Sequence, residues 1–266
     1  MPVRLTQSNL FPALSMSSTI STPDALRSEF RPFKGHCWRV VESQYVISTV
    51  PLVDTLDEQA RLEELLHETK PPVPPACRHL HPLLYTPFRY TPRHGSRFRR
   101  AGQREGAFYT AEHVETAIAE MAFYRILFYA EAPESLIPAG FAEYTAFSVS
   151  VATDALIDLT ERGDPSLSHL SDYSASQAFA DLARAAGATG LRSLSVRCPR
   201  KGTALTWLSC EVFDRPEPIL RQTWRMRLTR LGVQALCESP KLAIQFAPEV
   251  MASDARTAAF AWERAA

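Results

Sequence analysis

The chain has 266 residues, of which 45% are hydrophobic, and its 29 basic side chains balance 29 acidic ones. This length and composition favour one domain with extensions over two equal domains. The balanced charge gives no reason to expect direct binding of nucleic acid or of a membrane surface. The longest apolar stretch, Met121 to Ala130, is interrupted by Arg125 and is too short to span a bilayer.

Two further features favour the cytoplasm. The first 30 residues lack the continuous apolar segment of a secretory signal. The five cysteines are scattered, without a Cys-x-x-Cys pair, which is typical of free thiols in a reducing compartment. They are Cys37, Cys77, Cys198, Cys210 and Cys237. We therefore expect a cytoplasmic protein.

The first half of the chain predicts an arm, a strand region, a helix and a loop. Residues 1–35 are rich in Ser, Thr and Pro and predict a flexible arm. Trp38–Val50 is rich in Val, Ile and aromatic residues and predicts extended structure. Asp57–Thr69 has leucines at helical spacing and predicts a helix, which the prolines of Lys70–Pro75 end. Arg89–Arg104 follows as a loop with six arginines.

The second half mixes strands and helices. Strands are expected at Ala107–Thr110, Thr145–Thr153, Ala155–Leu159, Leu191–Cys198 and Ala204–Phe213, and helices from about Glu112 to Ala130 and from Ser174, paired with Gln177 in a capping box, to about Gly187. The tail, Arg221 to Phe246, combines strand and turn signals. Because regular βαβ spacing is absent from the pattern, we predict an α+β fold.

Glu120 stands out on the helix that follows the arginine loop. That helix is apolar nearly all round, which predicts burial on most sides. The positions three and four residues from Glu120 hold no cation, so the usual salt bridge along a helix is unavailable. A carboxylate in such a place either serves a ligand or reaches solvent or a distant arginine. The sequence leaves both interpretations open.

The arginine loop has three interpretations. Its guanidinium groups suit phosphate, because each offers a planar fork of donors and stays charged. They also suit RNA or a solvated surface. Only Tyr90 and Phe98 lie among the arginines, and the chain has no net positive charge, which argues against RNA.

Two other segments carry candidate polar groups. In Leu191–Cys198, alternation places Leu194 on an apolar core face and Ser195 on a polar face. No Gly-x-Ser-x-Gly elbow surrounds Ser195, so we expect a hydrogen-bonding role or a solvated strand face rather than a nucleophile. Cys77, His79 and His81 alternate as zinc ligands on a strand would, but no partner pair with metal spacing accompanies them, and we expect no metal.

Together, these segments resemble the RES domain, a family named for an arginine, a glutamate and a serine. The resemblance rests on GSRFRRAG (95–102), AFYTAEHVETAIAEMAFYR (107–125) and GLRSLSVRCPRKG (190–202), and a longer branch of the family also has WRVVESQ (38–44), LVDTLDEQ (52–59) and TPFRY (86–90). It implies a fold like that of the ADP-ribosyltransferases, with mixed sheets and helices around an NAD⁺ cleft. It also implies an NAD⁺-consuming enzyme without a metal, often the toxin of a pair neutralised by a helix-turn-helix antitoxin.

The resemblance assigns catalytic roles to Glu120, Arg97 and Tyr109, and substrate binding to Arg89, Tyr90 and Ser195. The second family arginine corresponds to Arg89 or to Arg39, and Arg89 is favoured because Tyr90 follows it. Two family asparagines are replaced here, by Arg99 and by Ala204.

The resemblance leaves the reaction partly open. The enzyme would cleave the nicotinamide–ribose bond as a glycohydrolase or phosphorylase, or would transfer ADP-ribose to a protein; a module that binds a nucleotide or a partner without turnover is the further alternative. Homo-oligomer formation also stays open. We expect an arm over 1–35, an extension packed on the core over 36–75, a RES-like domain over 76–215, and a C-terminal extension of the same domain over 216–266.

Overall fold

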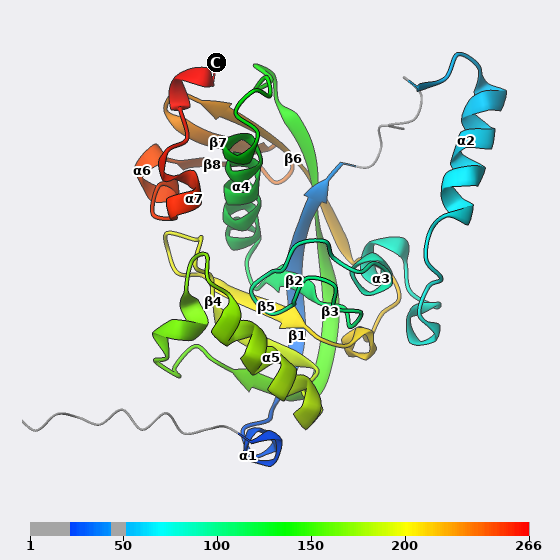
Figure 1. Ribbon diagram of the computed structural model, residues 1–266, viewed down its shortest axis with the longest axis vertical. Helices are drawn as coiled ribbons and strands as arrows, with labels where there is room; N and C mark the ends of the chain where they lie inside the picture. Colours follow the sequence, from blue (N-terminus) through cyan, green and yellow to red (C-terminus); the bar gives the residue numbers. More distant parts are fainter. Residues whose placement is uncertain (1–21, 44–51, 266) are drawn as a thin grey trace, which may run out of the picture.

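The computed structural model describes residues 22–43 and 52–265 (Figure 1). One eight-stranded sheet with helices packed around it makes up the fold, so the α+β prediction is confirmed. The strands are β1 (Arg31–Glu42), β2 (Phe108–Ala111), β3 (Ala142–Asp158), β4 (Gly190–Leu194), β5 (Thr203–Trp207), β6 (Leu220–Thr229), β7 (Gly232–Cys237) and β8 (Leu242–Phe246). The helices are α1 (Pro23–Arg27), α2 (Leu56–Glu68), α3 (Pro82–Arg89), α4 (Val114–Glu131), α5 (Ser174–Ala186), α6 (Pro248–Met251) and α7 (Ala255–Ala258).

Five strands of the sheet close into a ring. The sheet order is β1-β2-β5-β4-β3-β6-β7-β8, and β1 also pairs directly with β3. β1 and β3 are antiparallel and pair along the whole of β1, whereas β4 runs parallel to the end of β3. Beyond the ring, β6, β7 and β8 continue from β3 as antiparallel strands. The 17-residue β3 therefore belongs both to the ring and to this three-stranded wing.

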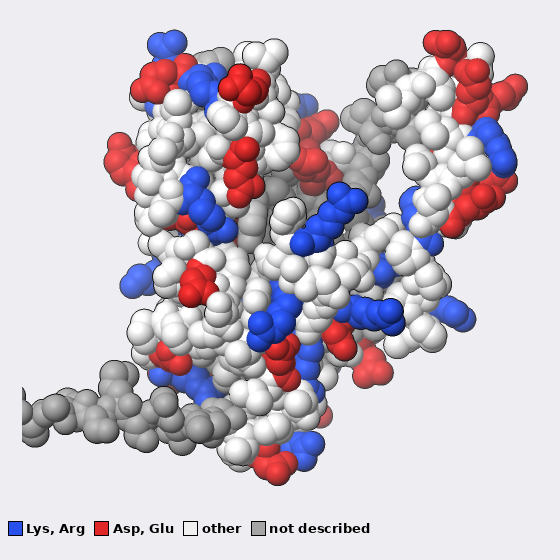
Figure 2. All heavy atoms as spheres, viewed as in Figure 1, with Lys and Arg blue, Asp and Glu red and all other residues white. Residues whose placement is uncertain are grey.

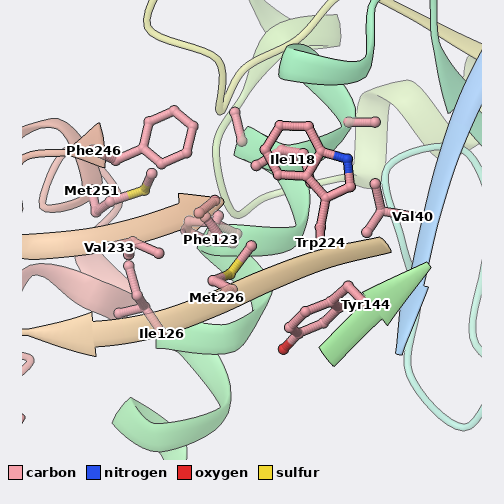
Figure 3. Packing of buried hydrophobic residues seen from close by; sticks show 14 of the residues in the cluster. Val40, Ile118, Phe123, Ile126, Tyr144, Trp224, Met226, Val233, Phe246 and Met251 are labelled. Atoms are coloured by element: carbon pink, nitrogen blue, oxygen red, sulfur yellow. The ribbon is translucent and has the colours of Figure 1, made fainter. Parts of the chain in front are cut away.

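Helix α4 fills the space between the ring and the wing. Its Ile118, Phe123 and Ile126 are almost fully buried and pack in one cluster with Trp224 and Met226 of β6 (Figure 3). Burying each such side chain contributes about 1.5–3 kcal/mol. The all-round apolar pattern of the sequence thus corresponds to a helix packed on several sides, and this packing fixes the height and rotation of Glu120.

Helices α1 and α5 cover the opposite end of the ring. Leu26 of α1 is fully buried in a cluster with Phe179 and Ala183 of α5. The expectation of a flexible arm is therefore wrong for residues 22–35. The segment is rich in Ser and Pro, but it also contains the buried Leu26 and the start of β1. Residues 1–21 lie outside the described range.

Helix α2 is confirmed where the leucine spacing predicted it, but it contributes nothing to the core. None of its residues is buried, and it projects from the body of the molecule (Figure 1). Thr55 and Glu58 close a capping box at its N-terminus. Acidic side chains gather on its surface (Figure 2). No helix in the described part of the chain is both long and apolar enough to cross a membrane.

Three sequence-based boundaries need correction. Two strands were expected between Thr145 and Leu159, but β3 is continuous there. The strand expected to reach Cys198 ends at Leu194, which is 37% exposed rather than in the core. Ser174 does not form a capping box with Gln177, because the Gln177 amide instead donates to the carbonyl groups of the arginine loop.

The cysteine expectation is also partly wrong. Cys77 and Cys210 form a disulfide with a Cα–Cα distance of 6.1 Å. Cys37, Cys198 and Cys237 are free and buried. The bond joins the 3₁₀ turn at Pro75–Cys77 to the turn at Cys210–Val212, 133 residues apart, and no spacing rule in the sequence pairs such distant positions.

Candidate active site

A cavity of about 350 Å³ opens between α4 and one face of the ring. Its floor follows one row of the sheet, because Trp38 of β1 pairs with Ala111 of β2, Ala111 with Ala204 of β5, and Ala204 with Ser193 of β4. Its remaining lining includes Arg39, Ser96, Arg97, Tyr109, Ala117, Glu120, Met121, Tyr124, Tyr173 and Arg197. Segments from seven parts of the chain therefore meet here, with Trp38 and three small side chains on the floor and charged and aromatic groups on the walls.

Glu120 lies on the wall that α4 contributes. Ala117, Glu120, Met121 and Tyr124 line the cavity together, as spacings of three and four residues along a helix require. Burial raises the pKa of Glu120, although the Ser195 hydrogen bond and the charges of Arg197 and Arg97 offset part of the rise. Among the described residues, no ion pair is formed by Glu120. The carboxylate is therefore held at the cavity without a neutralising partner.

A hydrogen bond from Ser195 fixes the Glu120 carboxylate. Its hydroxyl donates to Glu120 Oε1 at 2.5 Å and accepts from the backbone N–H groups of Arg197 and Cys198 at 3.2 and 3.0 Å. The side chain is 4% exposed and does not line the cavity. The sequence-predicted pair is thus brought together, and the geometry gives Ser195 a positioning contact with Glu120.

Gly202 allows this contact. Its carbonyl accepts from the Ser195 N–H at 2.8 Å, so the loop after β4 folds back toward α4. A Cβ at Gly202 would overlap the hydroxyl of Thr116 on that helix. Only glycine lets the backbone approach α4 this closely.

Hydrogen bonds hold the arginine loop against α5, the turn before α5 and the end of β4. Gln177 donates to the Ser96 carbonyl at 3.0 Å, and Ser176 donates to the Arg97 carbonyl at 2.5 Å. The Arg97 guanidinium donates to the carbonyl groups of Leu167 and Leu194, both at 2.9 Å. The Arg97 guanidinium therefore contributes positive charge to the cavity, while its hydrogen bonds to the two carbonyl groups fix the backbone at the cavity rim.

Arg39 and Arg89 differ sharply in position. Arg39 lines the cavity, donates to the Tyr109 carbonyl at 2.9 Å and stacks over Phe108. Its buried Nε has no hydrogen-bond partner among the described residues, and burial lowers its pKa to about 10. Arg89 instead donates to the Pro71 carbonyl at 2.5 Å, and neither it nor Tyr90 lines the cavity. Of the two candidates for the second arginine, the structure brings Arg39 to Glu120's cavity.

Tyr109 links β2 to the arginine loop. Its ring lines the cavity, and its hydroxyl hydrogen-bonds with the Ser96 hydroxyl at 2.7 Å and accepts from the Phe98 N–H at 3.1 Å. Burial raises the pKa of Tyr109. This phenol therefore stays neutral and holds the loop that carries Arg97.

The two positions where family asparagines are replaced have different surroundings. Arg99 is buried and donates to the carbonyl groups of Pro87, Tyr90 and Gln103, so it stabilises the arginine loop from inside. Ala204 lies on the cavity floor beside Ser193, whose buried hydroxyl has no partner in the described part of the structure. The second replacement thus lies beside a hydroxyl without a partner among the described residues, at the cavity floor.

Arg197 is the main cavity residue that sequence reasoning did not single out. It is 6% exposed, lies with its guanidinium carbon 3.7 Å from the centre of the Phe123 ring, and pairs with Asp254 at 2.7 Å. In the sequence, the position of Arg197 two residues after Ser195, on the same polar face of the segment, was the signal that could have indicated a place near the site. The partner 57 residues further on was not visible in any local pattern.

Within residues 22–43 and 52–265, no group of three or more His, Cys, Asp or Glu side chains could hold a metal ion. Cys77 is in the disulfide, and His81 Nδ1 accepts from the Leu83 N–H at the start of α3. The segment is a turn and a helix start rather than a strand, so the three candidate zinc ligands do not share a face.

Comparison with known proteins agrees with the family expected from the motifs. A search among curated proteins found no match. Among solved structures, the chain is similar to one in the crystal structure of the M. tuberculosis MbcT–MbcA toxin–antitoxin complex. The two are 16% identical, the match covers 75% of this chain and 89% of that one, and the TM-score is 0.43. The family model of the RES domain matches residues 74–229, more than half of the chain. The protein belongs to the RES-domain family.

Proposed function

We propose that this chain is an NAD⁺-consuming enzyme that cleaves the bond between nicotinamide and ribose. The observation that carries the proposal is Glu120, a carboxylate without an ion-pair partner in the described structure, fixed by Ser195 at the wall of a cavity. Cleavage of this bond builds positive charge on the ribose, as in glycoside hydrolysis. A fixed anion beside that carbon stabilises the transition state more than the ground state.

The other cavity residues fit the pyrophosphate and a ring of such a substrate. Arg39 and Arg97 supply positive charge for a pyrophosphate, and the unpaired Arg39 Nε is a free donor. Trp38, Tyr124 and Tyr173 supply aromatic surface for a ring. The volume is at the small end for ligand pockets, which suits the nicotinamide riboside half of the dinucleotide.

We further propose, from the family resemblance, that the chain acts on cytoplasmic NAD⁺ as the toxin of a toxin–antitoxin pair. The products of the reaction identify the acceptor of the ADP-ribosyl group. Water gives free ADP-ribose, phosphate gives its 1-phosphate, and a protein acceptor becomes labelled with ADP-ribose.

The test compares nicotinamide release from NAD⁺ by the wild type, Glu120→Gln and Glu115→Gln. Glu120→Gln keeps the size and loses the charge, so turnover should fall about 10²–10³-fold. Glu115 lies on the same helix and does not line the cavity, so its replacement should leave turnover unchanged. Absence of nicotinamide release by the folded wild type would refute the proposal.

The melting temperature of the same samples separates catalysis from folding. Because burial raises the pKa of Glu120, ionisation of this carboxyl destabilises the folded state. The stabilisation that belongs to the protonated carboxyl is fully present below the pKa of the unfolded chain, and it is lost as the pH rises through the pKa of the folded chain. Glu120→Gln should therefore melt at the same or a higher temperature at neutral pH. A destabilised variant with normal turnover per folded molecule would remove Glu120 from the mechanism.

A further inference from the structure

Arg197 presents a problem that the proposed function does not solve. The Ser195 backbone segment places this cation close enough for its charge to lower the pKa of Glu120, and both side chains line the same cavity. A buried guanidinium beside a carboxylate that lacks an ion pair would ordinarily close on it. Such a pair would neutralise the charge that the mechanism needs. Another group must therefore hold the Arg197 guanidinium away from the Glu120 carboxylate.

The restraint comes from the C-terminal helix. Asp254 precedes α7 as its N-cap residue, is 0% exposed, and accepts from Arg197 Nη1 at 2.7 Å. The other terminal nitrogen of Arg197 donates to the Leu170 carbonyl and, at 3.1 Å, to the Tyr173 hydroxyl. Both terminal nitrogens of Arg197 therefore have acceptors on the side of Asp254.

Arg256, in the first turn of α7, also binds the Asp254 carboxylate. It donates to both carboxylate oxygens of Asp254, at 3.1 and 2.8 Å, and to the same Leu170 carbonyl at 2.8 Å. Both guanidinium groups lie by the ring of Phe123, with carbon-to-centroid distances of 3.7 Å for Arg197 and 5.5 Å for Arg256. Phe123 is one helical turn from Glu120. Charges of alternating sign thus run from Glu120 through Arg197 and Asp254 to Arg256.

We propose that Asp254 is a positioning residue, which holds the Arg197 guanidinium off Glu120 and so keeps that carboxylate free for the ribose. This inference rests on the proposed function. It assigns a role in the site to the C-terminal segment, which lies outside the matched RES region at residues 74–229. The other ionisable groups that line the cavity with Glu120 are Arg39, Arg97, Tyr109, Tyr124 and Tyr173.

The first experiment measures kcat, KM and the pH profile of kcat for Asp254→Asn. Asparagine caps a helix as aspartate does, so α7 keeps its N-cap. Without the carboxylate, Arg197 turns to Glu120. We expect kcat per folded molecule to fall at least tenfold, KM to change less than threefold, and the acid limb of kcat to move to lower pH. Wild-type kcat per folded molecule with an unmoved acid limb would overturn the proposal.

Two variants make the test specific. Arg256→Gln removes the second cation and leaves Asp254 to Arg197, so kcat should stay within twofold of the wild type. In Asp254→Asn/Arg197→Gln no guanidinium remains to pair with Glu120, so kcat should recover severalfold over Asp254→Asn alone. A double variant no faster than the single one would mean that Arg197 serves the substrate directly, and the proposal would be wrong.

A readout without turnover separates this inference from the proposed function. If the wild type releases no nicotinamide, the proposed function fails, and melting temperatures alone still test the position of Arg197. Glu120→Gln should not lower the melting temperature of the parent, but should lower it when introduced together with Asp254→Asn, because it then breaks a new ion pair. The same effect in both backgrounds would overturn the proposal.

Tyr173→Phe serves if Asp254→Asn does not fold. It removes the hydroxyl that accepts from both Arg197 and Arg256 without changing any charge. The looser Arg197 should lower kcat severalfold and move the acid limb of kcat to lower pH. An unmoved acid limb with wild-type kcat in this variant would count against the restraint.

Discussion

Asp254 should stabilise the folded chain in a pH-dependent way. Burial alone would raise the pKa of this carboxyl, but the hydrogen bonds from Arg256 and the charges of Arg197 and Arg256 outweigh it and lower the pKa from its ordinary 3.8 to about 2. A difference of this size corresponds to roughly 2 kcal/mol of folding free energy at neutral pH. Because the folded-state pKa is the lower one, this stabilisation is present above about pH 5 and is lost as pH falls toward 2.

The assay is urea unfolding at several values between pH 6 and pH 3 for the wild type and Asp254→Asn. At neutral pH the variant should lose about 3–5 kcal/mol, because two cations remain without their counter-charge. By pH 3 about 1 kcal/mol of the wild-type advantage should be gone, because the carboxyl is by then mostly protonated in the unfolded state but still mostly ionised in the folded state. Asp24→Asn is the matched control, since Asp24 pairs with Arg27 at the exposed surface. A difference between the wild type and Asp254→Asn that stays constant from pH 6 to pH 3 would refute the reasoning.

Three further predictions concern the cavity, each measured as nicotinamide release per folded molecule. Arg39→Gln should lower turnover at least tenfold while Arg89→Gln leaves it unchanged, because only Arg39 lines the cavity; equal losses would return Arg89 to the site. Ser195→Ala should lower kcat by about 10–100-fold, the scale for one hydrogen bond to a charged group, and an unchanged kcat would contradict its positioning role. Gly202→Ala should cause a similar loss by pushing its loop off Thr116, and adding Thr116→Ala should restore part of the activity; no recovery would point to another cause.

The sequence was informative where a local pattern decides the structure. The apolar periodicity around Glu120 predicted a buried helix, and α4 has that place in the fold. The leucine spacing likewise predicted α2. The absence of a Gly-x-Ser-x-Gly elbow around Ser195 favoured a hydrogen-bonding role, and the structure places its hydroxyl within hydrogen-bonding distance of Glu120.

Features set by distant contacts escaped the same reasoning. Leu194 was expected in the core because the alternation was assumed to continue to Cys198, whereas β4 ends at Leu194 and the chain then turns back toward Gly202. The choice of Arg89 over Arg39 followed a neighbouring tyrosine, whereas access to the cavity depends on the pairing of β1 with β2 and β3. Asp254 is an ordinary aspartate in the sequence, and only the fold brings it to Arg197.

The position of β1 bears on how the protein can be divided. The matched RES region begins at residue 74, yet β1 ends at Glu42 and pairs with β3 along its whole length. A recombinant fragment cut to the matched region would expose a long row of unpaired backbone groups on β3, which is a template for aggregation. It would also lack Trp38 and Arg39 from the cavity. The region that the family model matches is here smaller than the unit that completes the sheet and the cavity.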